Sequence, residues 1–177
     1  GILEAYLGGE AVGKAVAEVL AGRKNPSGRL AETFPLRLEE TPCYLTYGKG
    51  FDNAVYQEGV FVGYRYYTSR KMETAFPFGY GLSYTTFAYS DLQLDKKEMS
   101  DKEHVEVSVK VKNIGKRAGK TVVQLYVAAP EAEVVRPVRE LRGFEKVSLE
   151  AGEEKTVTFT LDERAFSYWN TQIHDWY

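Results

Sequence analysis

The residues whose side chains could support binding chemistry are concentrated between Tyr56 and Phe87, in the stretch YQEGVFVGYRYYTSRKMETAFPFGYGLSYTTF. Aromatic rings can stack on the faces of sugar rings, so Tyr64, Tyr66 and the distant Trp169 are candidates for substrate binding. Packing is the alternative, because each Tyr or Phe buries a large apolar area with a definite ring geometry. The density of rings and glycines favours packing, and we expect most of these rings to be buried between two parts of a larger protein.

Glu58 is the carboxylate of this stretch that could act in acid–base chemistry. A carboxylate buried among rings loses much of its solvation free energy unless a cation compensates it. Arg65 follows in the same stretch, and a guanidinium can donate two hydrogen bonds to one carboxylate. We therefore predict an ion pair between Glu58 and Arg65. We interpret the alternation of Tyr64 and Tyr66 as a strand with two buried faces.

Other classes of site find little support in the composition. The 177 residues carry a formal net charge of −2 without a basic stripe, so we expect no nucleic-acid partner. His104 and His174 lack other metal ligands at suitable spacing, and Gly79-Tyr80-Gly81 precedes predicted strands instead of a helix, so we expect neither a metal site nor another cofactor. No apolar run approaches the roughly 20 residues of a membrane span. Cys43 is the only cysteine, which excludes an internal disulfide and slightly favours the cytoplasm over secretion.

Several motifs, in the same order, resemble the C-terminal part of glycoside hydrolase family 3, which includes β-glucosidases and β-xylosidases. The ring-rich stretch is similar to the family pattern YxEG(I/V)xVGYRYY followed by (F/Y)PFG(Y/H)GLSYTxF. Residues 9–35, GEAVGKAVAEVLAGRKNPSGRLAETFP, are similar to its helix and Asn-Pro-Ser-Gly turn. VVQLYV (122–127), RPVRELRGFEKV (136–147) and AFSYWN (165–170) resemble its terminal β-domain. The residues that carry the resemblance, and to which we assign structural roles, are Asn25, Pro26, Ser27, Gly28, Tyr56, Glu58, Gly63, Tyr64, Arg65, Tyr66, Tyr67, Phe78, Gly79, Gly81, Ser83 and Tyr84.

The resemblance implies retaining hydrolysis of β-glucosides or β-xylosides by an exo-acting enzyme of carbohydrate metabolism. Such an enzyme needs two carboxyl groups about 5–5.5 Å apart. In the family, the nucleophile is an Asp of a Ser-Asp-Trp-type motif on a TIM barrel, and the acid/base is a Glu well ahead of the Asn-Pro-Ser-Gly turn. Ser90-Asp91 and Ser100-Asp101 share only two letters of that motif, and His174-Asp175-Trp176 belongs to the terminal β motif. We therefore predict no catalytic residue in this chain, and we expect its partners to be the catalytic TIM-barrel and α/β domains of the same enzyme.

The elements around these motifs follow from the hydrophobic pattern. Apolar residues recur at helical spacing over 9–21, the turn at 25–28 stops the helix, and 30–34 is predicted to be extended. One helix and one strand cannot bury their own apolar faces, so we interpret residues 1–35 as the end of an α/β sandwich domain. Residues 36–85 are predicted to be an aromatic- and glycine-rich connector between domains.

From residue 86 to 177 the period of the pattern changes to two. Residues 105–111 alternate, 113–119 supply a turn, and 121–129 are predicted to return as the partner strand of an antiparallel hairpin. Further strands are predicted at 141–149 and 156–161. This pattern predicts a mainly β fold, a fibronectin type III or immunoglobulin-like sandwich, as the family resemblance also implies. The resemblance leads us to expect one more strand beyond Tyr177.

Two interpretations of the function follow. In the first, the chain is the C-terminal part of a β-glucosidase-like enzyme, supplies packing and stability, and is inactive alone. In the second, it is a carbohydrate-binding or adhesion-like β-sandwich module whose exposed rings bind sugar. Burial of Tyr64, Tyr66 and Tyr67 would support the first, and a planar exposed row of rings would support the second. We also consider a homo-oligomer, and the sequence leaves the preferred sugar open.

Overall fold

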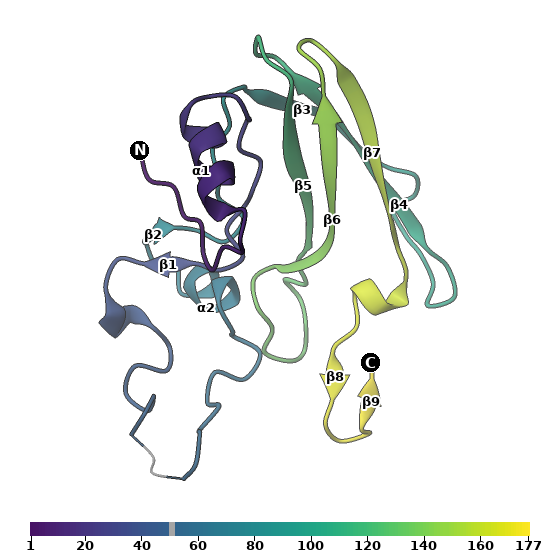
Figure 1. The fold of residues 1–177 in the computed structure, drawn as a ribbon. Coiled ribbons are helices and arrows are strands. Elements are labelled where there is room, and N and C mark those ends of the chain that lie inside the picture. Colours follow the sequence, from purple (N-terminus) through teal and green to yellow (C-terminus); the bar gives the residue numbers. More distant parts are fainter. Residues whose placement is uncertain (50–51) are drawn as a thin grey trace.

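The computed structural model describes residues 1–49 and 52–177 (Figure 1). Its first part contains helix α1 (Val12–Leu20), strand β1 (Phe34–Pro35) and the 3-10 helix η1 (Leu38–Glu40). The helix ends as predicted, because Gly22 adopts a φ of 69° and its amide donates to the carbonyl of Val19 at 2.9 Å. No residue of α1 is fully buried, and Val12, Ala15 and Leu20 of its apolar stripe are exposed.

The connector folds into helix α2 (Tyr64–Ser69) and strand β2 (Thr74–Phe76), which pairs antiparallel with β1. The strand predicted at Tyr64 and Tyr66 is therefore wrong. Gly63 precedes the helix with a φ of 59°, in the left-handed region that favours glycine. In a helix, residues three apart share a face, so Tyr64 lies beside Tyr67 and both line one small cavity.

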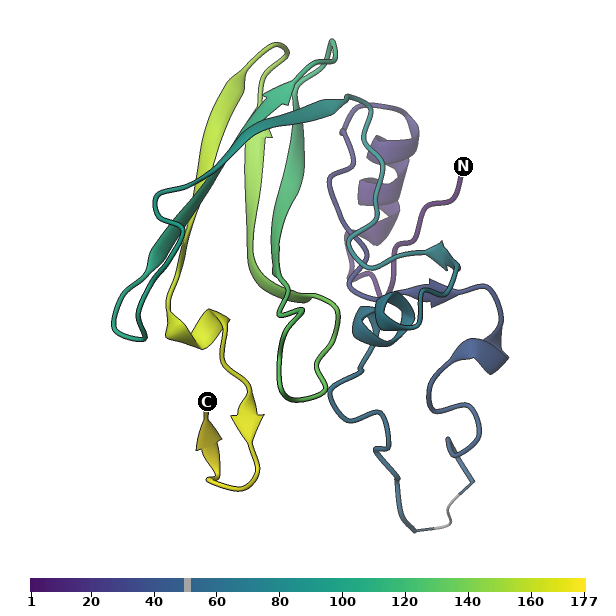
Figure 2. The ribbon, with the colours of Figure 1, turned by 180° about the vertical axis from the view of Figure 1, so that it is seen from behind.

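The second half of the chain forms two facing antiparallel sheets (Figures 1 and 2). One sheet has the order β3-β4-β7, with β3 (Phe87–Leu94), β4 (Val105–Asn113) and β7 (Glu154–Leu161). The other pairs β5 (Gly119–Val127) with β6 (Glu140–Leu149). Buried residues of both sheets meet in the core: Val111 and Val157 from the first sheet, and Val123, Val147 and Leu149 from the second. The mainly β sandwich predicted from the sequence is confirmed.

The predicted hairpin between residues 105–111 and 121–129 is wrong, because β4 and β5 lie in different sheets. The buried side chain of Asn113 explains the crossing. Its amide nitrogen donates to the carbonyls of Arg117 at 2.7 Å and Leu149 at 3.1 Å. Its amide oxygen accepts from Gly115 N at 3.1 Å and from the hydroxyl of Thr85 at 2.7 Å. These four hydrogen bonds hold the link between β4 and β5 across the end of the sandwich.

The C-terminal residues leave the sandwich through the 3-10 helix η2 (Glu163–Ala165) and form a small ribbon of β8 (Trp169–Asn170) and β9 (Asp175–Trp176). These two strands pair with each other, and Figure 2 shows the ribbon below the sheets. Within residues 1–49 and 52–177, no helix has the length and apolar character that a membrane crossing requires.

Candidate functional site

A network of side-chain hydrogen bonds lies where the first 35 residues and the connector meet the sandwich. Asn25, in the turn after α1, is at its centre. The amide nitrogen of Asn25 donates to the carbonyl of Ala118 at 2.9 Å. Its amide oxygen accepts from the hydroxyl of Ser83 at 2.9 Å and from the backbone amide of Tyr84 at 2.8 Å. One side chain thus joins three segments that are far apart in the sequence.

Tyr84 and Arg117 form hydrogen bonds with the C-terminal end of α1, next to the Asn25 network. The hydroxyl of Tyr84 donates to the carbonyl of Val19 at 2.8 Å, and Arg117 donates to the carbonyl of Gly22 at 2.5 Å. The guanidinium of Arg117 also lies 5.5 Å from the centre of the Tyr84 ring, within cation–π range. The last carbonyls of a helix lack partners inside the helix, so these donors stabilise its C-terminal end.

The glycines of the PFGYGLSY motif are required by close backbone packing. Gly79 has a φ of 79°, and its amide donates to the carbonyl of Leu30 at 2.8 Å. A methyl group at Gly81 would overlap the carbonyl oxygen of Gly28, in the Asn-Pro-Ser-Gly turn. Pro26 and Ser27 of that turn are half-buried. The two motifs therefore need small residues because they touch each other through their backbones.

Side chains of helix α2 contact β6 and the residues just before it. The ring of Tyr64 stacks on Phe78, with centroids 4.8 Å apart, and meets Tyr126 of β5 edge-on at 5.8 Å. Its hydroxyl accepts a hydrogen bond from the amide of Leu141 at 2.7 Å. One turn later, the hydroxyl of Ser69 accepts from the amide of Val138 at 3.2 Å. The helix therefore holds the connection from β5 to β6 in place.

Glu140 gathers three arginines at the same contact. Its carboxylate lies 2.8 Å from Arg136, 3.1 Å from Arg142 and 3.6 Å from Arg65 of α2, and its side chain is only 13% exposed. Arg136 also donates to the carbonyl of Phe166 at 2.7 Å. A carboxylate so shielded is stabilised by several charged donors at once.

The predicted ion pair between Glu58 and Arg65 is wrong. Arg65 pairs with Glu140 instead, and the ion pairs found among residues 1–49 and 52–177 do not include Glu58. The guanidinium of Arg65 in α2 lies 3.6 Å from the carboxylate of Glu140, at the start of β6. The backbone carbonyl of Glu58 accepts a hydrogen bond from the amide of Phe61 at 3.0 Å, within a turn before α2.

The connector rings are less uniformly buried than predicted. Tyr67 is 5% exposed, and burial raises the pKa of its phenol. Tyr66 is half-buried and lies nearly perpendicular to Tyr67, whereas Tyr56 is 89% exposed. Trp169 is 48% exposed and meets Trp176 at an angle of 70°. Tyr64, Tyr66 and Trp169 remain candidates for sugar binding only as predictions, and the rings around them are not coplanar.

The carboxylates weighed as catalytic candidates lie in exposed turns and strands. Asp91 pairs with Lys110 of the neighbouring strand at 2.8 Å. Asp175 accepts a hydrogen bond from the backbone amide of Trp176 at 2.7 Å. The described residues contain no group of three or more His, Cys, Asp or Glu side chains that could hold a metal ion. The prediction that neither Asp91 nor Asp175 is catalytic stays a prediction.

Sequence reasoning missed Asn113, Arg117, Tyr126 and Glu140. The one available signal was the stretch RPVRELR, where a single acidic residue stands between basic ones. Such a pattern indicates a salt-bridge network, yet it does not reveal that Arg65 of the connector joins it.

Two family models match separate parts of the chain. The family model for the glycosyl hydrolase family 3 C-terminal domain matches residues 1–84, and the model for a fibronectin type III-like domain matches residues 121–177. The chain belongs to glycoside hydrolase family 3. Its similarity to this family extends over both the α1 region and the sandwich.

Three relatives of this glycoside hydrolase family 3 chain illustrate the similarity, and each is longer than the chain. A thermostable β-glucosidase B of Acetivibrio thermocellus is 61% identical over 99% of the chain, which spans 23% of that protein. A crystal structure of a Bifidobacterium adolescentis family 3 β-glucosidase has a TM-score of 0.90 and 42% identity, covering 98% of the chain and 25% of its own. A crystal structure of a Kluyveromyces marxianus β-glucosidase in complex with glucose has a TM-score of 0.84 and 46% identity. The match covers 93% of this chain and 19% of the Kluyveromyces chain. The chain therefore spans about a quarter of the length of these relatives.

Proposed function

We propose that this chain is the C-terminal part of an exo-acting β-glucosidase that hydrolyses β-linked glucosides with retention of configuration. The names of the relatives support glucosides over xylosides, because three relatives that are 61%, 44% and 45% identical to the chain are called β-glucosidases. We divide the chain into the end of an α/β sandwich domain (1–35), an interdomain connector (36–85) and a fibronectin type III-like sandwich (86–177).

In this proposal the segment positions and stabilises domains, and the catalytic carboxylates come from the rest of the enzyme. The observation that carries it is the hydrogen-bond network of Asn25, which joins the turn after α1 to Ser83, Tyr84 and Ala118. The contacts of Tyr64 and Arg65 with Leu141 and Glu140 add a second set of bonds across the same boundary. Such a network fixes the sandwich relative to the domain that precedes it.

A separate sugar-binding module is less well supported. A flat platform for a sugar needs rings that are exposed and roughly coplanar. Tyr66 and Tyr67 instead cross at 81°, and Trp169 and Trp176 cross at 70°. Tyr64 uses one ring face to stack on Phe78. These arrangements are those of packed aromatic clusters.

The test compares the full polypeptide that contains this segment with the purified 177-residue chain. Both are assayed on aryl β-glucosides and aryl β-xylosides, and the anomer formed first is identified by NMR. We expect the full polypeptide to cleave the β-glucoside faster and to release β-glucose first, as a retaining enzyme does. We expect no turnover by the segment. Turnover by the segment that is lost in Glu58→Gln would contradict the proposal, as would α-glucose as the first product.

A further inference from the structure

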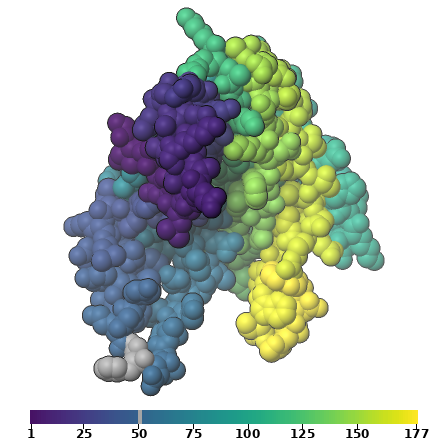
Figure 3. Space-filling view, viewed as in Figure 1, coloured from purple at the N-terminus to yellow at the C-terminus, as the bar shows by residue number. Residues whose placement is uncertain are grey.

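A projecting segment of the connector has an unusual surface for its position. Residues 41–49 and 52–62, which we call the arm, lie between η1 and α2 and contain neither a helix nor a strand. Figures 1 and 2 show the arm extending away from both sheets, and Figure 3 shows it at the lower edge of the molecule. Loops of this length within a domain are uncommon, and those that are ordered usually carry a function.

The arm exposes large apolar side chains instead of the polar ones of a linker. Tyr56 is 89% exposed, Tyr47 82% and Leu45 77%. Val55, Val60 and Val62 are also more than half exposed. Only Lys49, Asp52 and Glu58 are charged between residues 41 and 62. A flexible linker would be rich in Gly, Ser or Pro, whereas a surface rich in Tyr and poor in charge is typical of the centre of a protein interface.

The arm also has internal hydrogen bonds that order it before any partner binds. The side-chain amide of Gln57 donates to the hydroxyl of Thr46 at 2.8 Å. This hydrogen bond joins the two parts of the arm, 41–49 and 52–62. The amide of Tyr47 donates to the carbonyl of Cys43 at 2.8 Å, which closes a turn between these two residues. A surface that is already ordered loses less conformational entropy on binding.

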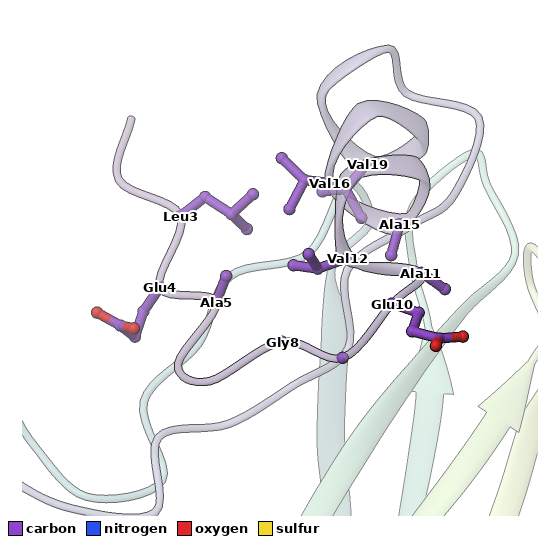
Figure 4. A pocket seen from close by; sticks show the side chains of 11 residues that line it. Leu3, Glu4, Ala5, Gly8, Glu10, Ala11, Val12, Ala15, Val16 and Val19 are labelled. Carbon is purple, nitrogen blue, oxygen red and sulfur yellow. The ribbon is translucent and has the colours of Figure 1, made fainter.

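A second uncovered apolar surface lies on the same side of the molecule. Figure 4 shows a shallow groove between the N-terminal segment and α1, where Leu3, Ala5, Val12 and Val16 face one another. In Figures 1 and 3, α1 and the arm both lie on the side away from β4 and β7. A partner large enough to cover α1 could therefore reach the arm from the same direction.

We propose that the arm docks onto the catalytic part of the same polypeptide, with Tyr47 and Tyr56 as its anchoring side chains. This inference rests on the proposed function. The relatives identify the occupant, since the chain spans only 23% of the Acetivibrio thermocellus enzyme and the remainder is large enough to cover both surfaces. The low charge of the arm fits an apolar contact within one polypeptide. Aromatic side chains of this kind supply most of the energy of such contacts.

The test is hydroxyl-radical footprinting of the full polypeptide, read by mass spectrometry at individual tyrosines. Tyr89 serves as the exposed reference, because it is 50% exposed on β3, and Tyr67 as the buried reference at 5%. We expect Tyr47 and Tyr56 to react several-fold more slowly than Tyr89, at a rate close to that of Tyr67. Rates equal to or above that of Tyr89 would overturn the proposal. A misfolded preparation is recognised because Tyr67 would then react rapidly.

The same measurement at several protein concentrations identifies the occupant. Protection that persists in the diluted monomer supports a contact within one polypeptide, whereas protection that is lost on dilution indicates a second copy and overturns the proposal. A β-glucosidase assay of the same preparation separates this inference from the proposed function. An active enzyme with reactive Tyr47 and Tyr56 refutes the docking alone, and an inactive one with both tyrosines protected refutes the activity alone.

Discussion

The guanidinium of Arg65, in the first turn of α2, lies 3.6 Å from the carboxylate of Glu140 at the start of β6. The pair joins the connector to the sandwich, and Arg136 and Arg142 also form ion pairs with the same carboxylate. A single acidic side chain therefore compensates three cations, which makes it the sensitive position of this contact.

Replacing that carboxylate is expected to weaken the protein. Glu140→Gln keeps the shape of the side chain but leaves three partly buried guanidiniums without their anion, so we expect a loss of about 2–4 kcal/mol in the free energy of unfolding. Urea unfolding of the purified protein measures it. Asp91→Asn is the control, because it breaks the exposed pair with Lys110 and should leave the midpoint nearly unchanged. Equal effects of the two variants would contradict this view of Glu140.

Loss of the Asn25 side chain is expected to loosen the boundary between α1 and the sandwich. Asn25→Ala removes three hydrogen bonds and leaves the backbone groups of Tyr84 and Ala118 without this partner, at a cost of about 2 kcal/mol. Thermal unfolding and limited proteolysis near residue 25 measure the change. Gln93→Ala, at an exposed position of β3, is the control and should have little effect. An unchanged melting temperature for Asn25→Ala would show that the network contributes nothing measurable.

Two glycine substitutions should act in opposite directions. Gly81→Ala places a methyl group against the carbonyl of Gly28, and backbone atoms cannot move aside cheaply, so we expect about 1–3 kcal/mol of destabilisation. Gly13→Ala adds the same methyl group in α1, where nothing lies within 4 Å, and should leave stability equal or slightly higher. Both are compared by thermal unfolding. Destabilisation by Gly13→Ala with no effect of Gly81→Ala would refute the packing argument.

The free energy of unfolding should depend on pH through Glu103, in the turn before β4. The backbone amide and hydroxyl of Ser100, together with Lys96, lower the pKa of Glu103 from 4.5 to about 2. A carboxyl whose pKa is lower in the folded state stabilises the fold above its unfolded pKa, and that contribution is lost as the pH falls toward 2. Glu103→Gln should therefore unfold more easily than the parent protein above pH 5 and match it near pH 2. Unfolding midpoints across this range test the sign, and a constant difference between the two proteins would contradict it.

Local patterns predicted the elements well. Helical spacing located α1, and period-two alternation located β4, β6 and β7, because both signals depend on near neighbours in the sequence. Strand pairing was predicted less well. The period-two pattern of a strand is the same whether the next strand pairs with it or crosses to the other sheet. The pattern therefore did not reveal the role of the buried Asn113 in the crossing.

The site was predictable as a region but not in its contacts. The ring-rich stretch does lie at the boundary, where Tyr64, Phe78 and Tyr84 form hydrogen bonds with Leu141, Thr33 and Val19 of other segments. The ion pair of Arg65 with Glu140 was missed because residues 64–66 were interpreted as a strand. In a strand the side chain of Arg65 would point in another direction than it does in α2. The exposure of Tyr56 was missed because composition cannot tell a ring that packs within the chain from one that faces outward.

The buried amide of Asn113 also constrains the order in which the chain folds. Its partners come from Thr85, from the adjoining loop and from Leu149, so they meet only after strands distant in sequence have paired. Contacts of high sequence separation form slowly, because the intervening loops must first be closed. This end of the sandwich should therefore be completed late, after the local hairpin of β5 and β6 has already formed.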